Sequence, residues 1–108
     1  MDKTYNWIRI AEDTGSFEFN KNQIAQIEVS EKKICIVQTK SGLKACSSKC
    51  PHAGGDLSLG FLDKRENIIC PVHGYHFNLR TGRDTNEEGY FLKIYPLKIT
   101  ENGVFIGI

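Results

Sequence analysis

The chain has 108 residues, and its 14 Lys and Arg against 13 Asp and Glu give a formal net charge of +1. With 40% hydrophobic and 25% charged residues, it has the composition of one ordinary soluble domain, residues 1–108, with a modest apolar core. Neither nucleic-acid binding nor a membrane span is indicated, because the charge is balanced and no apolar run approaches about 20 residues.

The N-terminal segment carries no targeting signal that we recognise. Residues 1–7 lack the apolar core of a signal peptide, and charged residues recur through the first thirty positions. We therefore expect a cytoplasmic protein, in which the four cysteines are metal ligands and reduced thiols rather than disulfides.

Short β-branched and aromatic runs separated by Gly, Asn, Asp and Ser predict β-strands almost throughout. The first strand is expected over residues 7–10. Alternating apolar residues over 24–29 predict a second strand with one buried face. Residues 33–38 and 43–46 predict a hairpin across a tight turn at 40–42.

The side chains of this hairpin allow two further expectations. Cys35 and Cys46 lack ligand spacing, so we expect buried thiols, with redox sensing as the alternative. Five lysines also gather in this part of the chain, namely Lys32, Lys33, Lys40, Lys44 and Lys49. A solvated face of the hairpin is favoured over a docking patch.

Two groups of potential metal ligands follow, Cys50-Pro51-His52 and Cys70-Pro71-Val72-His73, separated by residues 53–69. Two Cys with two His are a site for a soft metal or an iron–sulfur cluster. The unequal spacing favours two loops that meet across a site over two copies of one knuckle. Gly54 and Gly74 allow the backbone to turn away and bring N–H groups close to bridging sulfides.

The remaining segments complete an all-β pattern. Apolar packing beneath the first ligand group is expected from Leu57, Leu59, Phe61 and Leu62. Further elements are a short strand at 68–69, a strand at 74–79, an acidic loop at 84–89, and a closing hairpin of 95–100 with 104–108 across an Asn-Gly turn.

The ligand spacing, Cys50-x-His52 and then Cys70-x-x-His73 after 17 residues, resembles the Rieske [2Fe–2S] signature. The similarity extends through residues 50–58 and 70–82 and, more weakly, to Tyr95-Pro96-Leu97. It implies an antiparallel β-sandwich core and a two-loop cluster-binding subdomain at about 46–83. It also implies one [2Fe–2S] cluster per chain.

By this resemblance, Cys50 and Cys70 bind the inner iron, and His52 and His73 bind the outer iron. The surrounding residues implied by the same resemblance are Pro51, Gly54, Gly55, Val72, Gly74, Tyr75 and Phe77. His76 falls outside both ligand groups, and we expect a packed or surface side chain.

Several departures from the high-potential members of the family predict a low reduction potential. Those members carry a disulfide at the positions of Gly55 and Val72, and donate Ser and Tyr hydroxyls to the cluster from the positions of Tyr75 and Phe77. Rieske potentials span about −150 to +300 mV, and we expect a value below zero here. Residues 83–95 also lack a proline that covers the cluster in many Rieske ferredoxins, so the role of the loop at 84–90 stays open.

No nucleophile–base arrangement or open metal position indicates catalysis. The resemblance implies a one-electron carrier, not an enzyme, like the ferredoxin component of ring-hydroxylating oxygenase systems. It would accept electrons from a reductase and pass them to a terminal oxygenase through transient contacts, most simply as a monomer. The contact surface is expected around the outer iron, at Pro51, Ala53, Gly54, Val72, Gly74 and Tyr75.

Two alternative functions belong to classes other than the electron carriers. The small subunit of assimilatory nitrite reductases resembles the domain in size and fold, and co-purification with a large sirohaem subunit distinguishes it. A zinc-stabilised interaction module is the other, because Cys2His2 is also a zinc ligand set. Zinc protein is colourless, whereas a Rieske protein is red-brown.

Overall fold

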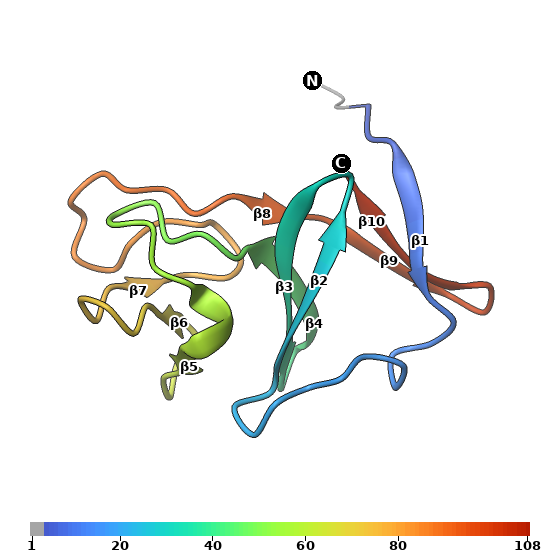
Figure 1. Cartoon of the computed structure of the whole chain (residues 1–108), viewed down its shortest axis with the longest axis horizontal. Helices are drawn as coiled ribbons and strands as arrows, with labels where there is room; N and C mark the ends of the chain where they lie inside the picture. The colour runs from blue at the N-terminus through green and yellow to red at the C-terminus, as the bar shows by residue number, and fades with distance from the viewer. Residues whose placement is uncertain (1–3) are drawn as a thin grey trace.

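The computed structural model describes residues 4–108, so the first three residues of the segment examined for a targeting signal lie outside it. Its regular structure is almost entirely antiparallel β-sheet, which confirms the expected fold class (Figure 1). The elements are β1 Trp7–Ala11, β2 Ile24–Val29, β3 Lys32–Thr39, β4 Gly42–Ser47, the 3-10 turn η1 Leu57–Leu59, β5 Phe61–Leu62, β6 Ile68–Ile69, β7 His76–Phe77, β8 Ile94–Tyr95, β9 Leu97–Thr100 and β10 Gly103–Gly107. Across residues 4–108 no helix has the length and apolar character needed to cross a membrane.

The strands form three sheets. One has the order β1-β10-β9, the second β2-β3-β4-β8, and the third β5-β6-β7. In Figure 1 the third sheet and the long loops next to it lie at one end of the molecule, away from β1, β9 and β10. The hairpin of β3 and β4 follows the predicted strands closely, with Thr39 opposite Gly42 at its turn.

The last predicted hairpin is wrong in one respect, because residues 95–100 are not one strand. Tyr95 pairs with Ala45 in the second sheet, whereas Leu97 pairs with Ile106 in the first. Pro96 stands between them and has no N–H to donate to a continuous ladder. The chain therefore passes from one sheet to the other at this proline.

The strand predicted at 74–79 is also shorter than expected. It ends at Phe77, because the side chain of Asn78 accepts hydrogen bonds from the N–H groups of Arg80 and Thr81, at 2.8 and 3.0 Å. Such Asn bonds to the following backbone stabilise a turn in place of a strand.

Strand β3 lies between two apolar clusters and contributes side chains to both. Because side chains alternate along a strand, Ile34 and Ile36 face the cluster between the first two sheets, and Cys35 and Val37 face the opposite side. The cluster on the side of Cys35 and Val37 also contains Ile24, Cys46, Cys50, Leu57, Ile68, Cys70, Phe77, Leu79 and Leu92. The two ligand groups are thus anchored on the reverse face of the core sheet.

The prediction of four apolar residues packed beneath the first ligand group is half wrong. Leu57 is fully buried and Leu62 partly so, but Leu59 is 70% exposed and Phe61 48% exposed. Two residues in one 3-10 turn point in different directions, since each residue advances by a third of a turn. Phe61 lies on the outer strand of its sheet, on the face opposite Leu62.

Candidate functional site

The two ligand groups lie on backbone turns with the same hydrogen bonds. In the first turn, Cys50 N–H donates to Gly55 O and Gly54 N–H donates to Cys50 O, both at 2.8 Å. In the second, Cys70 N–H donates to Tyr75 O at 2.8 Å and Gly74 N–H donates to Cys70 O at 2.9 Å. The two loops meet across the site as expected, but their backbone hydrogen bonds correspond more closely than the unequal ligand spacing indicates. The loops differ in which position carries the imidazole.

Glycine is required at the same point of both turns. Gly54 has φ +73° and Gly74 has φ +71°, in the left-handed region that L side chains rarely adopt. The two glycines therefore fix the path of each turn, as the sequence predicts for them.

The two thiols meet at the inner side of these turns. Cys50 and Cys70 are both buried and belong to the same apolar cluster, in which the two thiols lie close enough to influence one another. Burial raises the pKa of the Cys50 thiol, and the backbone N–H groups of Ala53 and His52 lower it in part. N–H groups directed at a sulfur are the environment that a metal-bound thiolate requires.

The two imidazoles also meet, at the outer side. The ring centroids of His52 and His73 are 4.9 Å apart, with the rings nearly perpendicular at 84°. His73 is exposed and His52 is half-buried, and among the described residues the buried Nδ1 of His52 has no hydrogen-bond partner. A buried polar atom without a partner needs an explanation, and a metal–ligand bond supplies one.

The ligand side chains are arranged as pairs and not as one tetrahedral group. Within residues 4–108, no three side chains of His, Cys, Asp or Glu converge on a point where one ion would bind. A structural zinc site requires four ligands around one ion. A pair of thiols on one side and a pair of imidazoles on the other instead fits the two irons of a [2Fe–2S] cluster.

Two tyrosines cover His52. Tyr75 stacks on its ring with a centroid distance of 4.0 Å and an angle of 15°, and Tyr90 meets it edge-on at 5.1 Å. Tyr90 also contacts Tyr75, at 5.6 Å. Tyr90 is not among the residues predicted for the site, although an aromatic residue in a loop without the usual proline is a usable signal. Tyr90 is thus the residue through which the loop at 84–90 covers the site.

A buried aspartate holds Tyr90 in place. Asp84 accepts hydrogen bonds from Glu88 N–H at 3.0 Å and from Tyr90 N–H at 2.9 Å. The bond from Glu88, with further help from Tyr90 and neighbouring N–H groups, lowers the pKa of Asp84. The acidic loop is therefore an ordered turn built around one carboxylate, in which Glu87 and Glu88 are exposed.

Gly55 and Val72 lie against each other where the two turns meet. A Cβ atom added to Gly55 would lie 3.4 Å from Val72 Cβ and 2.9 Å from Cys70 Sγ. Cβ atoms of disulfides are about 3.5–4.5 Å apart. The proximity supports the assignment of these two positions to the disulfide of high-potential family members.

The other predicted residues divide into a surface and a core group. Pro51, Ala53, Gly54, Val72 and Gly74 are exposed around the two turns, and Phe77 is fully buried beneath Tyr75. His76 lies apart from the ligands, with Nδ1 2.7 Å from Asp63 Oδ2.

Cys35 and Cys46 are buried thiols, as predicted. They are opposite each other on β3 and β4 and lie in the same apolar cluster as Cys50 and Cys70. The hydrogen bond between the two thiols lowers the pKa of Cys35 and raises that of Cys46.

Comparison with known proteins gives a family match over most of the chain. The model of the family described as Rieske [2Fe-2S] domain matches residues 6–95. The chain is 28% identical over 106 residues to the ferredoxin component of the naphthalene 1,2-dioxygenase system of Pseudomonas aeruginosa, covering 97% of this chain and 98% of that protein. It is 30% identical over 90 residues to human apoptosis-inducing factor 3, covering 82% of this chain but only 15% of that longer protein.

Solved structures share the fold at low identity. The small subunit of a putative NADH-dependent nitrite reductase from Mycobacterium tuberculosis superposes with a TM-score of 0.81 at 14% identity, covering 98% of this chain and 97% of that one. A chain from the complex of reduced oxygenase and oxidized ferredoxin in carbazole 1,9a-dioxygenase gives a TM-score of 0.73 at 22% identity, covering 92% and 99%.

Proposed function

Because the chain belongs to the Rieske [2Fe–2S] domain family, whose cofactor is a [2Fe–2S] cluster, we propose that it carries single electrons from a reductase to a terminal oxygenase. The observation that carries the proposal is the meeting of two buried thiols and two imidazoles on paired turns. Nearly full-length similarity to a ferredoxin component, which is a carrier and not a catalyst, supports it.

The four ligand side chains would hold the cluster in two pairs. Cys50 and Cys70 would bind the buried iron, and His52 and His73 would bind the iron nearer the surface, His52 through its partnerless Nδ1. The bound cluster accepts and releases one electron at a time. We assign the cluster-binding subdomain to residues 46–83 within one domain, 1–108.

The hydroxyl groups near the ligands favour a low potential. Hydrogen bonds to a cluster stabilise its reduced form. Phe77 has no hydroxyl, and Tyr75 is too long to place its hydroxyl where the serine of the high-potential members lies. Burial, followed by interaction with the Glu88 side chain, raises the pKa of Tyr75. We therefore expect neither residue to supply the donor that raises the potential of other Rieske proteins.

The surface around His73 suits brief contact with redox partners. His73 is exposed and is surrounded by small, mostly apolar residues, including Pro51, Ala53 and Val72. A small apolar contact below about 1,200 Å² favours rapid release. We propose that electrons enter and leave here, that the protein works as a monomer, and that it resides in the cytoplasm.

A nitrite reductase subunit is the second candidate. The TM-score of 0.81 to such a small subunit supports it, although the identity of 14% shows the fold alone. Stable co-purification with a large sirohaem-containing subunit would favour this candidate, whereas a carrier should purify alone.

The cluster assignment is tested with ligand and control variants. The purified protein should be red-brown, contain iron and acid-labile sulfide in equal amounts, and bleach partly with dithionite. Cys70→Ser and His73→Ala should lose the reducible absorption. His76→Ala is the matched control, because His76 bonds Asp63 and should leave the absorption unchanged. The assignment would be contradicted if His76→Ala lost the reducible absorption while Cys70→Ser and His73→Ala kept it.

A further inference from the structure

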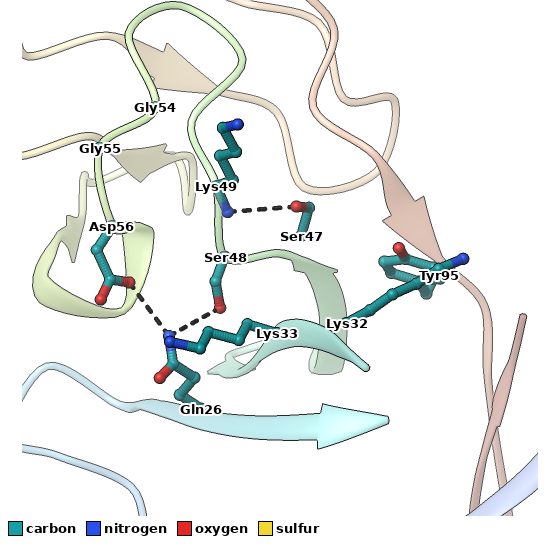
Figure 2. A pocket seen from close by; sticks show the side chains of 10 residues that line it. All are labelled: Gln26, Lys32, Lys33, Ser47, Ser48, Lys49, Gly54, Gly55, Asp56 and Tyr95. Carbon is teal, nitrogen blue, oxygen red and sulfur yellow. Dashed lines mark hydrogen bonds between the residues drawn. The ribbon is translucent and has the colours of Figure 1, made fainter. Parts of the chain in front are cut away.

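We propose that a lysine-lined pocket beside the first ligand turn docks an acidic segment of the redox partner. This inference rests on the proposed carrier function and specifies the partner's chemistry. The pocket has a volume of about 430 Å³ (Figure 2). The residues that matter are Lys32, Lys33, Lys49, Gly54, Gly55 and Asp56; we call this group the lysine pocket.

The lysines come together through backbone pairing that their sequence positions do not reveal. Lys32 and Lys33 begin β3, whereas Lys49 directly precedes Cys50. Ser48 N–H donates to Lys33 O at 3.0 Å, which brings the start of β3 next to the entry of the first ligand turn. Figure 2 shows Lys33 extending toward Gln26 and Asp56, Lys49 toward the Gly54 turn, and Lys32 in the opposite direction, toward Tyr95.

The three ammonium groups are available to an external anion. Lys32, Lys33 and Lys49 are all exposed. Among residues 4–108 the one ion pair within 4.0 Å joins His76 to Asp63, so none of the three has a carboxylate partner. The whole chain carries a formal charge of only +1, so the pocket is a local concentration of positive charge.

One oxygen of the carboxylate in the pocket accepts hydrogen bonds from neutral groups. Asp56 Oδ1 accepts hydrogen bonds from Gln26 Nε2 at 3.2 Å, Ser58 N–H at 2.9 Å and Ser58 Oγ at 2.6 Å. Glu28, directly opposite Lys33 on β2, does not line the pocket and forms no ion pair with it. The pocket lining therefore carries three lysines and one carboxylate, a net positive charge.

The pocket and the ligand site share backbone. Gly54 and Gly55 belong to the turn that presents His52 and also line the pocket. Lys49 Cε lies 3.5 Å from the position of a Cβ on Gly54. An occupant of the pocket would consequently sit beside the exposed ligand edge, where electron transfer is proposed.

The dimensions and donors of the pocket favour a protein segment over a small anion. A single phosphate is far smaller than 430 Å³ and is usually held by converging backbone N–H groups. Here the Gly54 N–H already donates to Cys50 O. Three separate, flexible ammonium groups instead match several carboxylates on one acidic strand or loop, and complementary charge of this kind raises association rates.

Binding is tested by adding acetylated hexaglutamate to the ¹⁵N-labelled holoprotein at low salt. Amide shifts should concentrate on the lysine pocket and disappear in a variant with Lys32→Glu, Lys33→Glu and Lys49→Glu. A control with Lys21→Glu, Lys40→Glu and Lys64→Glu has the same charge change on exposed lysines outside the pocket and should keep the shifts. Absent or scattered shifts would overturn the proposal. So would inorganic phosphate that gives the same shifts at equal or lower concentration, since that identifies a small-anion site.

The consequence for electron transfer is measured with charged oxidants. Oxidation of the dithionite-reduced protein by hexacyanoferrate(III), an anion, should be at least threefold slower in the pocket variant and nearly unchanged in the control. The difference should vanish in 0.5 M NaCl, where the screening length is short. A variant with the three pocket lysines changed to Gln should be intermediate. Equal slowing in the pocket and control variants would show an effect of net charge alone and overturn the proposal.

The two proposals fail in different ways. A wild-type protein without a reducible cluster would refute the carrier function, while the peptide titration would still report on the pocket. A reducible cluster with no peptide binding at the pocket would leave the carrier function standing and refute the docking site.

Discussion

His52 and His73 have different environments, although the same role is proposed for both. His73 is exposed, whereas His52 lies under Tyr75 and against Tyr90. Solvent access is one of the variables that sets the properties of an iron–sulfur site. The outer edge of the site is consequently asymmetric, and a partner reaches it more directly through His73.

Tyr90 should matter to the durability of the site. Tyr90→Ala removes ring contacts to His52 and Tyr75, and aromatic pairs contribute about 0.5–1.5 kcal/mol each. We expect the visible absorption to decay faster in this variant during incubation at fixed temperature in air. Tyr90→Phe keeps the ring and should behave like the wild type. Equal decay of the alanine variant and the wild type would contradict the covering role.

Asp63 should contribute stability that depends on pH. Burial alone would raise its pKa, but hydrogen bonds from His76 and Asn67 outweigh this effect and lower the pKa of Asp63 from 3.8 to about 2. The stabilisation is then complete above pH 3.8 and is lost as the pH falls through about 2.

Asp63→Asn tests this directly by urea unfolding. Loss of the charged acceptor should lower the free energy of unfolding by roughly 1–2 kcal/mol at pH 6. The difference from the wild type should shrink toward pH 2. A difference that is constant over this range would show that the carboxylate charge has no part in it.

At the scale of elements, the two ligand turns have almost no free space between them. A Cβ on Gly55 would lie 2.6 Å from Val72 Cγ2, and Cys70 Sγ would be nearly as close. Gly55→Ala should therefore force the turns apart and destabilise the protein by about 1–3 kcal/mol. Adding Val72→Ala should restore part of the loss, because it removes the nearer clash. Denaturant midpoints of the two variants provide the measurement, and no rescue by Val72→Ala would contradict the packing.

Elements with strong alternation of apolar residues, or with a fixed spacing of Cys, His and Gly, could be predicted from the sequence. The bounds of β2 and of the β3–β4 hairpin follow from apolar alternation and a glycine turn, and the ligand turns follow from Cys, His and Gly spacing. The passage of the chain from one sheet to the other at Pro96 was not predicted. Strand propensity depends on neighbouring residues, whereas the sheet that a strand joins depends on residues far away in the sequence.

Features made by long-range pairing could not be predicted. Tyr90 reaches His52 because Asp84 shapes its loop, and Lys33 and Lys49 line one pocket because Ser48 pairs with β3. In both cases the residues are separated in the chain, and no periodic pattern links them. The expectation of a solvated lysine face accounts for the exposure of the lysines but not for their place around one pocket.

For the whole molecule, we expect an electron carrier with a low reduction potential. No hydroxyl at the position of Phe77 is available to the cluster, Tyr75 stands where the high-potential members have a serine, and no disulfide joins residues 55 and 72. The midpoint potential should be below zero, within the lower part of the range of about −150 to +300 mV known for Rieske centres. A dye-mediated redox titration gives the value, and a strongly positive potential would refute this account of the surroundings.

The central claim is that two thiols bind one iron and two imidazoles bind the other. Mössbauer spectroscopy of the oxidised ⁵⁷Fe protein tests it most directly, because the two ligand sets give the irons different electron densities. We predict two iron sites of equal area with distinct isomer shifts, and on reduction the added electron should localise on the imidazole-bound iron. A single iron environment, or stoichiometric zinc in place of iron, would contradict the claim.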